Sequence, residues 1–380
     1  MVPAMIALLA AACQGRRDWK SSALHAAQIR WAIRTGLGPL LLYTVTVDST
    51  ITTSPLWPLL RGANLTARVL SGEQFDAMCE ILDACAGHVP SIALLKGISI
   101  AEQHYPAPHL RPMRDIDFLV EEAALPTVES LLYKLGYRQQ SHLPPQFYDT
   151  HHHRMPFVHP QRGMWVEVHR GLFPSNTRVG AARVFSHEHV ASQLRPSTFQ
   201  GRSISRLSDA LQIAYTASHW AFNFRSIGGM VAMLDLIYLM QNMKDTVPWG
   251  SLLDWLEDSV AATHLYLMLS YLTKYHLVDV PPEILRDLSV RQGALDLLNL
   301  NLMHTLIDRY VVKGYPGGRL CSVDHLDTLW QTLLMPGPPL TNLLRVPWNL
   351  FLASRLKSAC SELPQLLLTL LTSRRQRPII

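Results

Sequence analysis

The stretch LRPMRDIDFLVEE, residues 110–122, places Asp115 and Asp117 at the start of an otherwise apolar run. Side chains at positions i and i+2 of a strand point to the same face, so the two carboxylates lie together, opposite Ile116 and Phe118. Two neighbouring carboxylates repel each other unless a cation lies between them. Because oxygen ligands favour hard divalent ions, the pair predicts a Mg²⁺ or Mn²⁺ site.

A third carboxylate is expected from a neighbouring strand, because a two-metal phosphoryl-transfer site must hold two ions about 3.5–4 Å apart. The run WVEVHR, residues 165–170, supplies it, since Glu167 alternates with valines and shares a face with Trp165 and His169. We therefore predict that Asp115, Asp117 and Glu167 are the metal ligands. His169 could orient a metal-bound water or the acceptor, or could be a packed, hydrogen-bonded histidine.

A phosphate-binding element is predicted in LLKGIS, residues 94–99, where an apolar run ends and a helix begins. Gly97 allows a close backbone approach, the helix N-terminus favours an anion, and Lys96 adds a positive charge. Arg111 and Arg114 flank the carboxylates and are further candidates for contacts with the triphosphate. These four residues, together with His153 and His169, are the predicted nucleotide-binding set.

Three consecutive histidines, His151–His153, begin the segment HHHRMPF. On a regular strand such side chains would alternate between faces and make a poor tetrahedral zinc site. We therefore expect a loop beside the active site, with His153 facing it. His219 and Asp235 lie on apolar helical stretches, so each needs a polar partner, either the other residue or the site.

The spacing of apolar residues predicts helices at both ends of the chain and an α+β unit between them. Ser71 is expected to be the N-cap of a helix that ends near Gly87, because Gln74 follows as in a capping box. Gly136 is expected to end another helix. Strands are predicted in SIALLKG, DIDFLV, RMPFVHP and GMWVEVHRG, with QRG as a hairpin turn between the last two.

The composition limits the classes of protein that the chain can belong to. It has 380 residues, of which 48% are hydrophobic and 17% are charged, which is typical of a globular protein. The net charge of +5 suits anionic partners such as nucleotides and does not by itself indicate a nucleic-acid binder. Five irregularly spaced cysteines argue against a disulfide framework and favour the cytoplasm.

Both ends of the chain contain apolar stretches. The first, MVPAMIALLAAACQG, lacks preceding basic residues, so an amphipathic helix is favoured over a targeting signal. The C-terminal stretch from LLRVPWNLFLASRLKS to TSRRQR is interpreted as an amphipathic helix packed on its own domain. Contact of this segment with a membrane surface is the less favoured alternative.

The motifs LLKGIS, RPMRDIDFLV, LLYKLGY, HHHRMPF and WVEVHR, in this order, resemble the bacterial uncharacterised nucleotidyltransferase family, part of the DNA polymerase β-like nucleotidyltransferase superfamily. LSDALQIAYTASHW and MLDLIYLM resemble the later helices of this family, so the resemblance covers roughly residues 5–310. Two departures are visible. Lys96-Gly97 replaces the superfamily's Gly-Ser, as is usual in this family, and Arg170 replaces the Trp of the family's ELHW.

The resemblance implies an α+β fold in which a small mixed-sheet, polymerase β-like palm is embedded in a mostly helical chain. The expected regions are N-terminal helices at 1–88, the palm at 89–200, a helical domain at 201–325 and a Leu/Arg/Pro-rich helical segment at 326–380.

The activity implied is Mg²⁺-dependent transfer of a nucleoside monophosphate from an NTP to a hydroxyl or phosphate acceptor. The acceptor, a small molecule, sugar, peptide or protein, is not specified by the sequence. Two alternatives are a non-catalytic binding protein that keeps the fold, and another transferase that uses the same metal site on a sugar or peptide.

Overall fold

The structure is a computed structural model, and it describes residues 26–45, 52–222, 230–243, 246–256, 259–308 and 329–335, together with residues 345 and 349. The expectations for the first 15 residues fall outside these ranges, as do those for almost all of the C-terminal Leu/Arg segment. Within the described ranges no helix is both long enough and apolar enough to cross a membrane.

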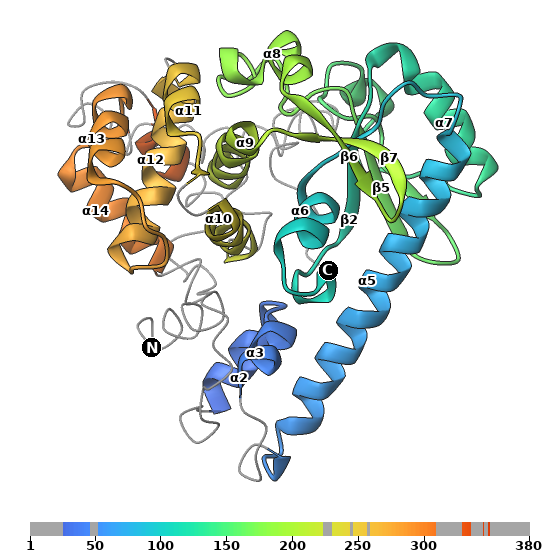
Figure 1. Ribbon diagram of the computed structural model, residues 1–380, viewed down its shortest axis with the longest axis horizontal. Helices are drawn as coiled ribbons and strands as arrows, with labels where there is room; N and C mark the ends of the chain where they lie inside the picture. Colours follow the sequence, from blue (N-terminus) through green and yellow to red (C-terminus); the bar gives the residue numbers. More distant parts are fainter. Residues whose placement is uncertain are drawn as a thin grey trace, which may run out of the picture.

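A seven-stranded mixed sheet forms the α+β unit (Figure 1), with the strand order β3-β4-β5-β2-β1-β7-β6. β2 is parallel to β5 and β1 is parallel to β7, whereas the other neighbours are antiparallel. The sheet and the helices that surround it confirm the predicted α+β class. The strands are β1 (Ala93–Leu94), β2 (Asp115–Leu119), β3 (Arg138–Gln139), β4 (Phe157–His159), β5 (Met164–His169), β6 (Leu194–Phe199) and β7 (Arg202–Leu207).

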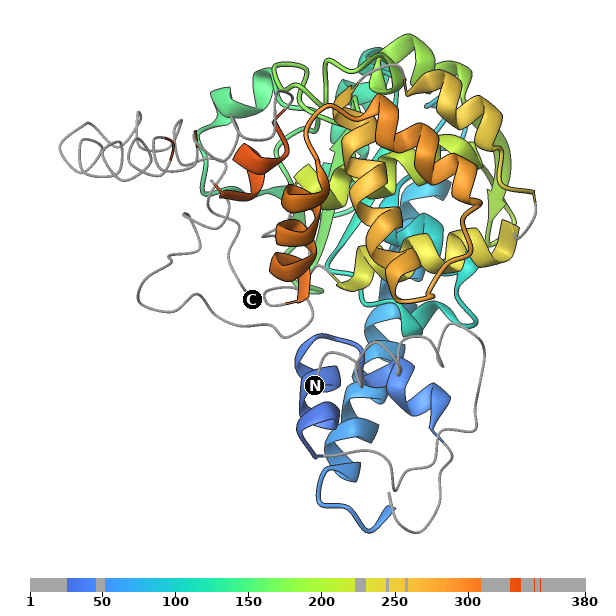
Figure 2. The ribbon, with the colours of Figure 1, turned by 90° about the vertical axis from the view of Figure 1, so that its left-hand side faces the viewer.

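Helices precede, interrupt and follow the sheet. The α-helices are α2 (Ala26–Arg34), α3 (Gly38–Thr44), α5 (Trp57–Cys85), α6 (Lys96–His104), α7 (Leu125–Lys134), α8 (His187–Ser192), α9 (Asp209–Phe222), α10 (Met230–Met243), α11 (Trp249–Trp255), α12 (Ser259–Lys274), α13 (Pro282–Arg291) and α14 (Leu297–Leu306). Short 3₁₀ helices lie at Pro108–Leu110, Glu122–Ala124, Pro145–Asp149 and Arg183–Phe185. Figure 2 shows α2 and α3 below the main body, beside the first half of α5.

The apolar residues of β2 and β5 build the core on one face of the sheet. Ile116, Phe118, Val166 and Val168 are fully buried there, among apolar residues of α5 and α7. Because side chains alternate along a strand, this burial turns the intervening polar residues of β2 and β5 to the opposite face. That face is occupied by α6, which also packs against α10 (Figure 1).

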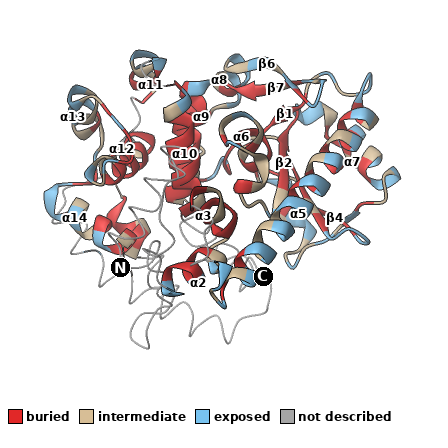
Figure 3. Cartoon of the chain, turned by 60° about the horizontal axis from the view of Figure 1, so that its bottom comes forward, coloured by how far each residue is buried: buried red, intermediate tan, exposed pale blue. Residues whose placement is uncertain are grey.

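A second, larger core holds the helices that follow the sheet. Trp220 of α9 and Tyr271 of α12 are fully buried in it, and nearly all of α9 and α10 is buried (Figure 3). A helix buried on every side cannot keep a polar residue without a partner. Asp235 of α10 is one such residue, and its partners belong to the site described below.

Two expectations about the elements were wrong or incomplete. Ser71 is not an N-cap, because α5 begins at Trp57 and Ser71 is a buried residue within it. The hairpin of β6 and β7 was not predicted, because its strands are rich in Arg and Ser and lack apolar alternation. Its turn is Gln200-Gly201, where both residues have positive φ (47° and 78°), as a type I′ turn requires.

Candidate metal centre

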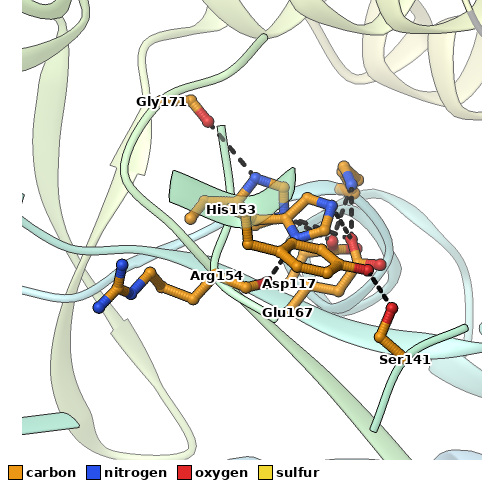
Figure 4. Close-up of polar contacts among 9 residues, drawn as sticks. Asp117, Ser141, His153, Arg154, Glu167 and Gly171 are labelled. Carbon is orange, nitrogen blue, oxygen red and sulfur yellow. Dashed lines mark hydrogen bonds and ion pairs between the residues drawn. The ribbon is translucent and has the colours of Figure 1, made fainter. Parts of the chain in front are cut away.

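Asp117 and Glu167 lie directly opposite each other on the parallel strands β2 and β5. Both residues are buried, with relative exposures of 2% and 6%. Figure 4 shows the two carboxylates side by side above the sheet. The predicted alternation on the two strands is confirmed, and the register brings these two acids to the same level of the sheet.

His169, the last residue of β5, completes a group of three possible ligands. Its Nε2 lies 2.9 Å from Asp117 Oδ1 and 3.7 Å from Glu167 Oε2, and its Nδ1 lies 3.4 Å from the carbonyl oxygen of Gly171. One donor atom from each of Asp117, Glu167 and His169 lies within 4.8 Å of the others. Two carboxylates and one imidazole are a donor set that fits a divalent metal ion.

Lys96, the first residue of α6, lies beside the carboxylates of Asp117 and Glu167. Its Nζ is 2.7 Å from Asp117 Oδ1 and 3.8 Å from Glu167 Oε2. Its backbone has φ of 46°, a left-handed conformation that is uncommon for a residue other than glycine. Such conformations cluster at functional sites, where the surroundings hold them in place. The structure therefore places this lysine on the carboxylates, whereas the sequence suggested a role at the phosphates.

The charges of this group control its protonation. Burial favours neutral Lys96, but the negative charges of Asp117 and Glu167 outweigh burial and raise the pKa of the ammonium. Burial also favours neutral Asp117, but Lys96 and the hydrogen bond from His169 hold the pKa of this carboxyl below its usual range. The two groups therefore form a buried ion pair at neutral pH.

Asp115, the other predicted ligand of β2, lies at the edge of this group. It is half-buried, pairs in register with Trp165, and is not one of the three closely spaced donors. Its negative charge contributes to the raised pKa of Lys96, so it acts on the same region. Its role as a metal ligand stays a prediction.

Arg111 forms an ion pair with Asp235 of α10. Its Nε donates to Asp235 Oδ1 at 2.9 Å and its Nη2 donates to Oδ2 at 2.7 Å, while Tyr105 donates its hydroxyl to Oδ1 at 2.8 Å. This bidentate pair gives Asp235 the partner that its sequence context required. The predicted contact of Arg111 with the triphosphate would have to be made by a guanidinium already bound to Asp235.

Gly97 lies under this arginine, at the second position of α6. A Cβ built at Gly97 would overlap the Arg111 guanidinium and lie 2.9 Å from Cγ of Met113. The glycine is therefore required for close packing between the start of α6 and Arg111. Arg114 is exposed, and its predicted role at the phosphates stays a prediction.

His153 faces the carboxylates from the segment that precedes β4. It forms an isolated antiparallel bridge with His169, and its Nε2 lies 3.9 Å from Glu167 Oε2. Figure 4 shows its ring beside Asp117 and Glu167. His151 and His152 were not predicted as site residues, yet their rings gather with that of His153. The only sequence signal for them was the run of three histidines itself.

A sheet that carries paired carboxylates beside a Lys-Gly helix start is consistent with metal-dependent phosphoryl-transfer chemistry. The chain belongs to the family described as "Uncharacterised nucleotidyltransferase", whose model matches residues 23–306. It is thus an enzyme of the nucleotidyltransferase class, and its family implies a nucleotide substrate.

Comparison with solved structures gave a protein from Helicobacter pylori, described as "Crystal structure of JHP933 from Helicobacter pylori". The two chains share 15% identity with a TM-score of 0.29, over 64% of this chain and 94% of the other. A comparison with curated proteins gave no match.

Proposed function

We propose that this enzyme transfers a nucleoside monophosphate from an NTP to a hydroxyl or phosphate acceptor, with Mg²⁺ or Mn²⁺ bound by Asp115, Asp117 and Glu167. The observation that carries the proposal is the register of β2 and β5, which sets Asp117 directly beside Glu167. Two buried carboxylates in this position favour a cation. His169 supplies a nitrogen donor next to them.

When bound, the metal ion would neutralise charge on the triphosphate and on the leaving pyrophosphate. The acceptor oxygen forms a bond to the α-phosphorus, and the bond from that phosphorus to the bridging oxygen breaks. In this proposal Glu167 takes the proton of an acceptor hydroxyl. Asp117 and Glu167 otherwise act as fixed ligands, so that catalysis consists mainly of positioning and charge neutralisation.

The start of α6 is the proposed phosphate contact. Backbone N–H groups at a helix N-terminus favour an anion, and Gly97 lets the Arg111 guanidinium pack closely against this helix start. A divalent ion on the carboxylates would compete with the Lys96 ammonium for Asp117. We propose that Lys96 then turns from the carboxylates to the triphosphate, which lies within reach of the same helix start.

The test compares α-labelled with γ-labelled NTPs in the presence of Mg²⁺ or Mn²⁺, with candidate acceptors from each chemical class. Transfer of the α label with release of pyrophosphate is the expected result. Transfer of the γ label instead would show a kinase reaction and overturn the proposal.

Nucleotide binding by calorimetry tests the site without an acceptor. Each NTP is titrated, with and without Mg²⁺, into the wild type and into the double variant Asp115→Asn/Asp117→Asn. We expect metal-dependent binding that the double variant loses. Binding that is unchanged in the folded double variant would place the nucleotide elsewhere.

A further inference from the structure

The three residues His151, His152 and His153 form a second group of possible ligands, here called the histidine cluster. Their ring centroids lie 4.2–4.8 Å apart, and one nitrogen from each ring lies within 4.8 Å of the others. The rings do not alternate between two faces, because His151 and His152 lie in a bend and not in a regular strand. The strand geometry that would make consecutive histidines poor zinc ligands is therefore absent here.

The backbone of the histidine cluster is fixed against the end of β5 by Arg170. The backbone N–H of Arg170 donates to the carbonyl oxygen of His152 at 2.9 Å, and its Nε donates to that of His151 at 2.8 Å. Its Nη2 also donates to the carbonyl oxygen of Tyr148 at 3.1 Å. The residue that departs from the family pattern thus holds the histidine-bearing loop in place, as a supporting residue of a ligand site should.

The hydrogen bonds around His153 determine which of its ring nitrogens has a lone pair for a metal ion. Nδ1 of His153 lies 2.7 Å from the carbonyl oxygen of Arg154, and because a carbonyl oxygen only accepts, this nitrogen carries the hydrogen. In the neutral ring the lone pair is then on Nε2, which faces Glu167. Such a tautomer, fixed through Nδ1 by a backbone carbonyl, is typical of histidines that bind metals.

His152 is 9% exposed, and its Nδ1 is buried with no hydrogen-bond partner among the residues that the structure describes. A buried polar nitrogen without a partner is a cost that a bound ion would remove.

We propose that the histidine cluster binds a divalent transition-metal ion of the zinc class. This site lies next to the carboxylate centre, which consists of Asp117, Glu167 and His169. Imidazole nitrogens suit Zn²⁺ and related ions, whereas Mg²⁺ prefers oxygen. Three histidines leave the fourth tetrahedral position for water or for Glu167, whose Oε2 lies 3.9 Å from Nε2 of His153. Nitrogen ligands of tetrahedral zinc are roughly 3.4 Å apart, so small side-chain rotations would close the present arrangement.

The test uses the full chain, stripped with a chelator and titrated with Zn²⁺ by calorimetry and with Co²⁺ by visible absorption. Wild-type protein is compared with His151→Ala and His152→Gln. His159→Gln is the matched control, because His159 is also 9% exposed but lies outside the cluster, on β4. Asp117→Asn separates this site from the carboxylate centre.

We expect one equivalent of Zn²⁺ or Co²⁺ that Asp117→Asn retains, with the Co²⁺ spectrum of a four-coordinate site, in addition to any ion that the wild type binds at Asp117, Glu167 and His169. His151→Ala and His152→Gln should weaken binding at least tenfold, whereas His159→Gln and Asp117→Asn should retain it. The absence of stoichiometric binding by the wild type would overturn the proposal. So would binding that survives both cluster variants but disappears in Asp117→Asn.

One further measurement needs no variant, so it tests the proposal even if the cluster variants fail to fold. X-ray absorption on the Zn²⁺-loaded wild type counts nitrogen ligands directly, and fewer than three imidazoles per ion would contradict the cluster. Metal binding is measured without nucleotide or acceptor, so its outcome is independent of the proposed reaction. Failure of nucleotidyl transfer would leave the result of this experiment unchanged.

Discussion

The carboxylate centre and the histidine cluster are neighbours, since the rings of His152 and His153 contact that of His169, but they are built by different means. Asp117, Glu167 and His169 come from two parallel strands whose opposite faces are locked into the core. The histidine cluster comes from one bend, held by hydrogen bonds from Arg170. The first group consists mainly of oxygen donors and already contains a cation, the Lys96 ammonium. The second contains only nitrogen donors.

The difference shows how one face of a sheet, with the bend beside it, can offer two kinds of ligand. Strand register fixes side chains with little freedom, which suits groups that must not move during a reaction. A bend can bring consecutive side chains together, which a strand cannot do. If the two regions have separate roles, changes in one should affect transfer, and changes in the other should affect the binding of a nitrogen-preferring metal.

The largest expected effect is that of Asp117→Asn on nucleotidyl transfer. The change removes a negative ligand that contacts both Lys96 and His169, so we expect the rate to fall on the order of 1,000-fold or more. Transfer of an α-labelled NTP measures the rate. His151→Ala is the comparison, and it should reduce the rate far less. Equal losses in the two variants would show that the two regions form one catalytic unit.

Lys96→Met should destabilise the protein by roughly 3 kcal/mol, because removal of one partner leaves a buried charge without its counter-ion. Urea unfolding measures the loss. The double variant Lys96→Met/Asp117→Asn should lose less than the sum of the single variants, since the two residues interact directly. Added Mg²⁺ should stabilise Lys96→Met more than it stabilises the wild type. Strict additivity would contradict a direct ion pair.

A smaller effect is expected from pH. Because the pKa of Asp117 is lower in the folded protein than its unfolded value of about 3.9, its stabilising contribution is present above that value. The contribution is lost as the pH falls through the lower, folded value. The stability difference between the wild type and Asp117→Asn should therefore shrink as the pH falls from about 5 to about 2. Urea midpoints across this range test the direction, and a difference that grows in acid would contradict it.

The smallest effect expected is that of Gly97→Ala. The added methyl group would meet the guanidinium of Arg111, so we expect a loss of about 1–2 kcal/mol and a lower transfer rate. Gly62→Ala is the matched control, because Gly62 is also in a helix but its added Cβ would meet no atom of another described part of the chain within 4 Å. It should be neutral or slightly stabilising. If the two variants change stability by the same amount, the contact with Arg111 adds no cost, which would mean that Arg111 can move away from the added methyl group.

Local patterns in the sequence determined much of the carboxylate centre. Alternation with apolar neighbours placed Asp117, Glu167 and His169 on the polar faces of two strands, and burial of the other faces makes this outcome almost obligatory. The order of motifs around these strands also indicated the family. The long extent of α5 and the polar hairpin of β6 and β7 escaped prediction, since neither has a clear local signal at its start.

Only the tertiary structure decided which groups meet. The pairing of Asp117 with Glu167 depends on the register between strands that are about 50 residues apart, and no local pattern specifies that register. The ion pair of Lys96 with Asp117 depends on the packing of α6 against the sheet, and that of Arg111 with Asp235 depends on the packing of α10 against α6. The histidine cluster depends on a bend held by Arg170. Sequence periodicity reports the face of one element, whereas a site is formed between elements, where long-range packing sets the distances.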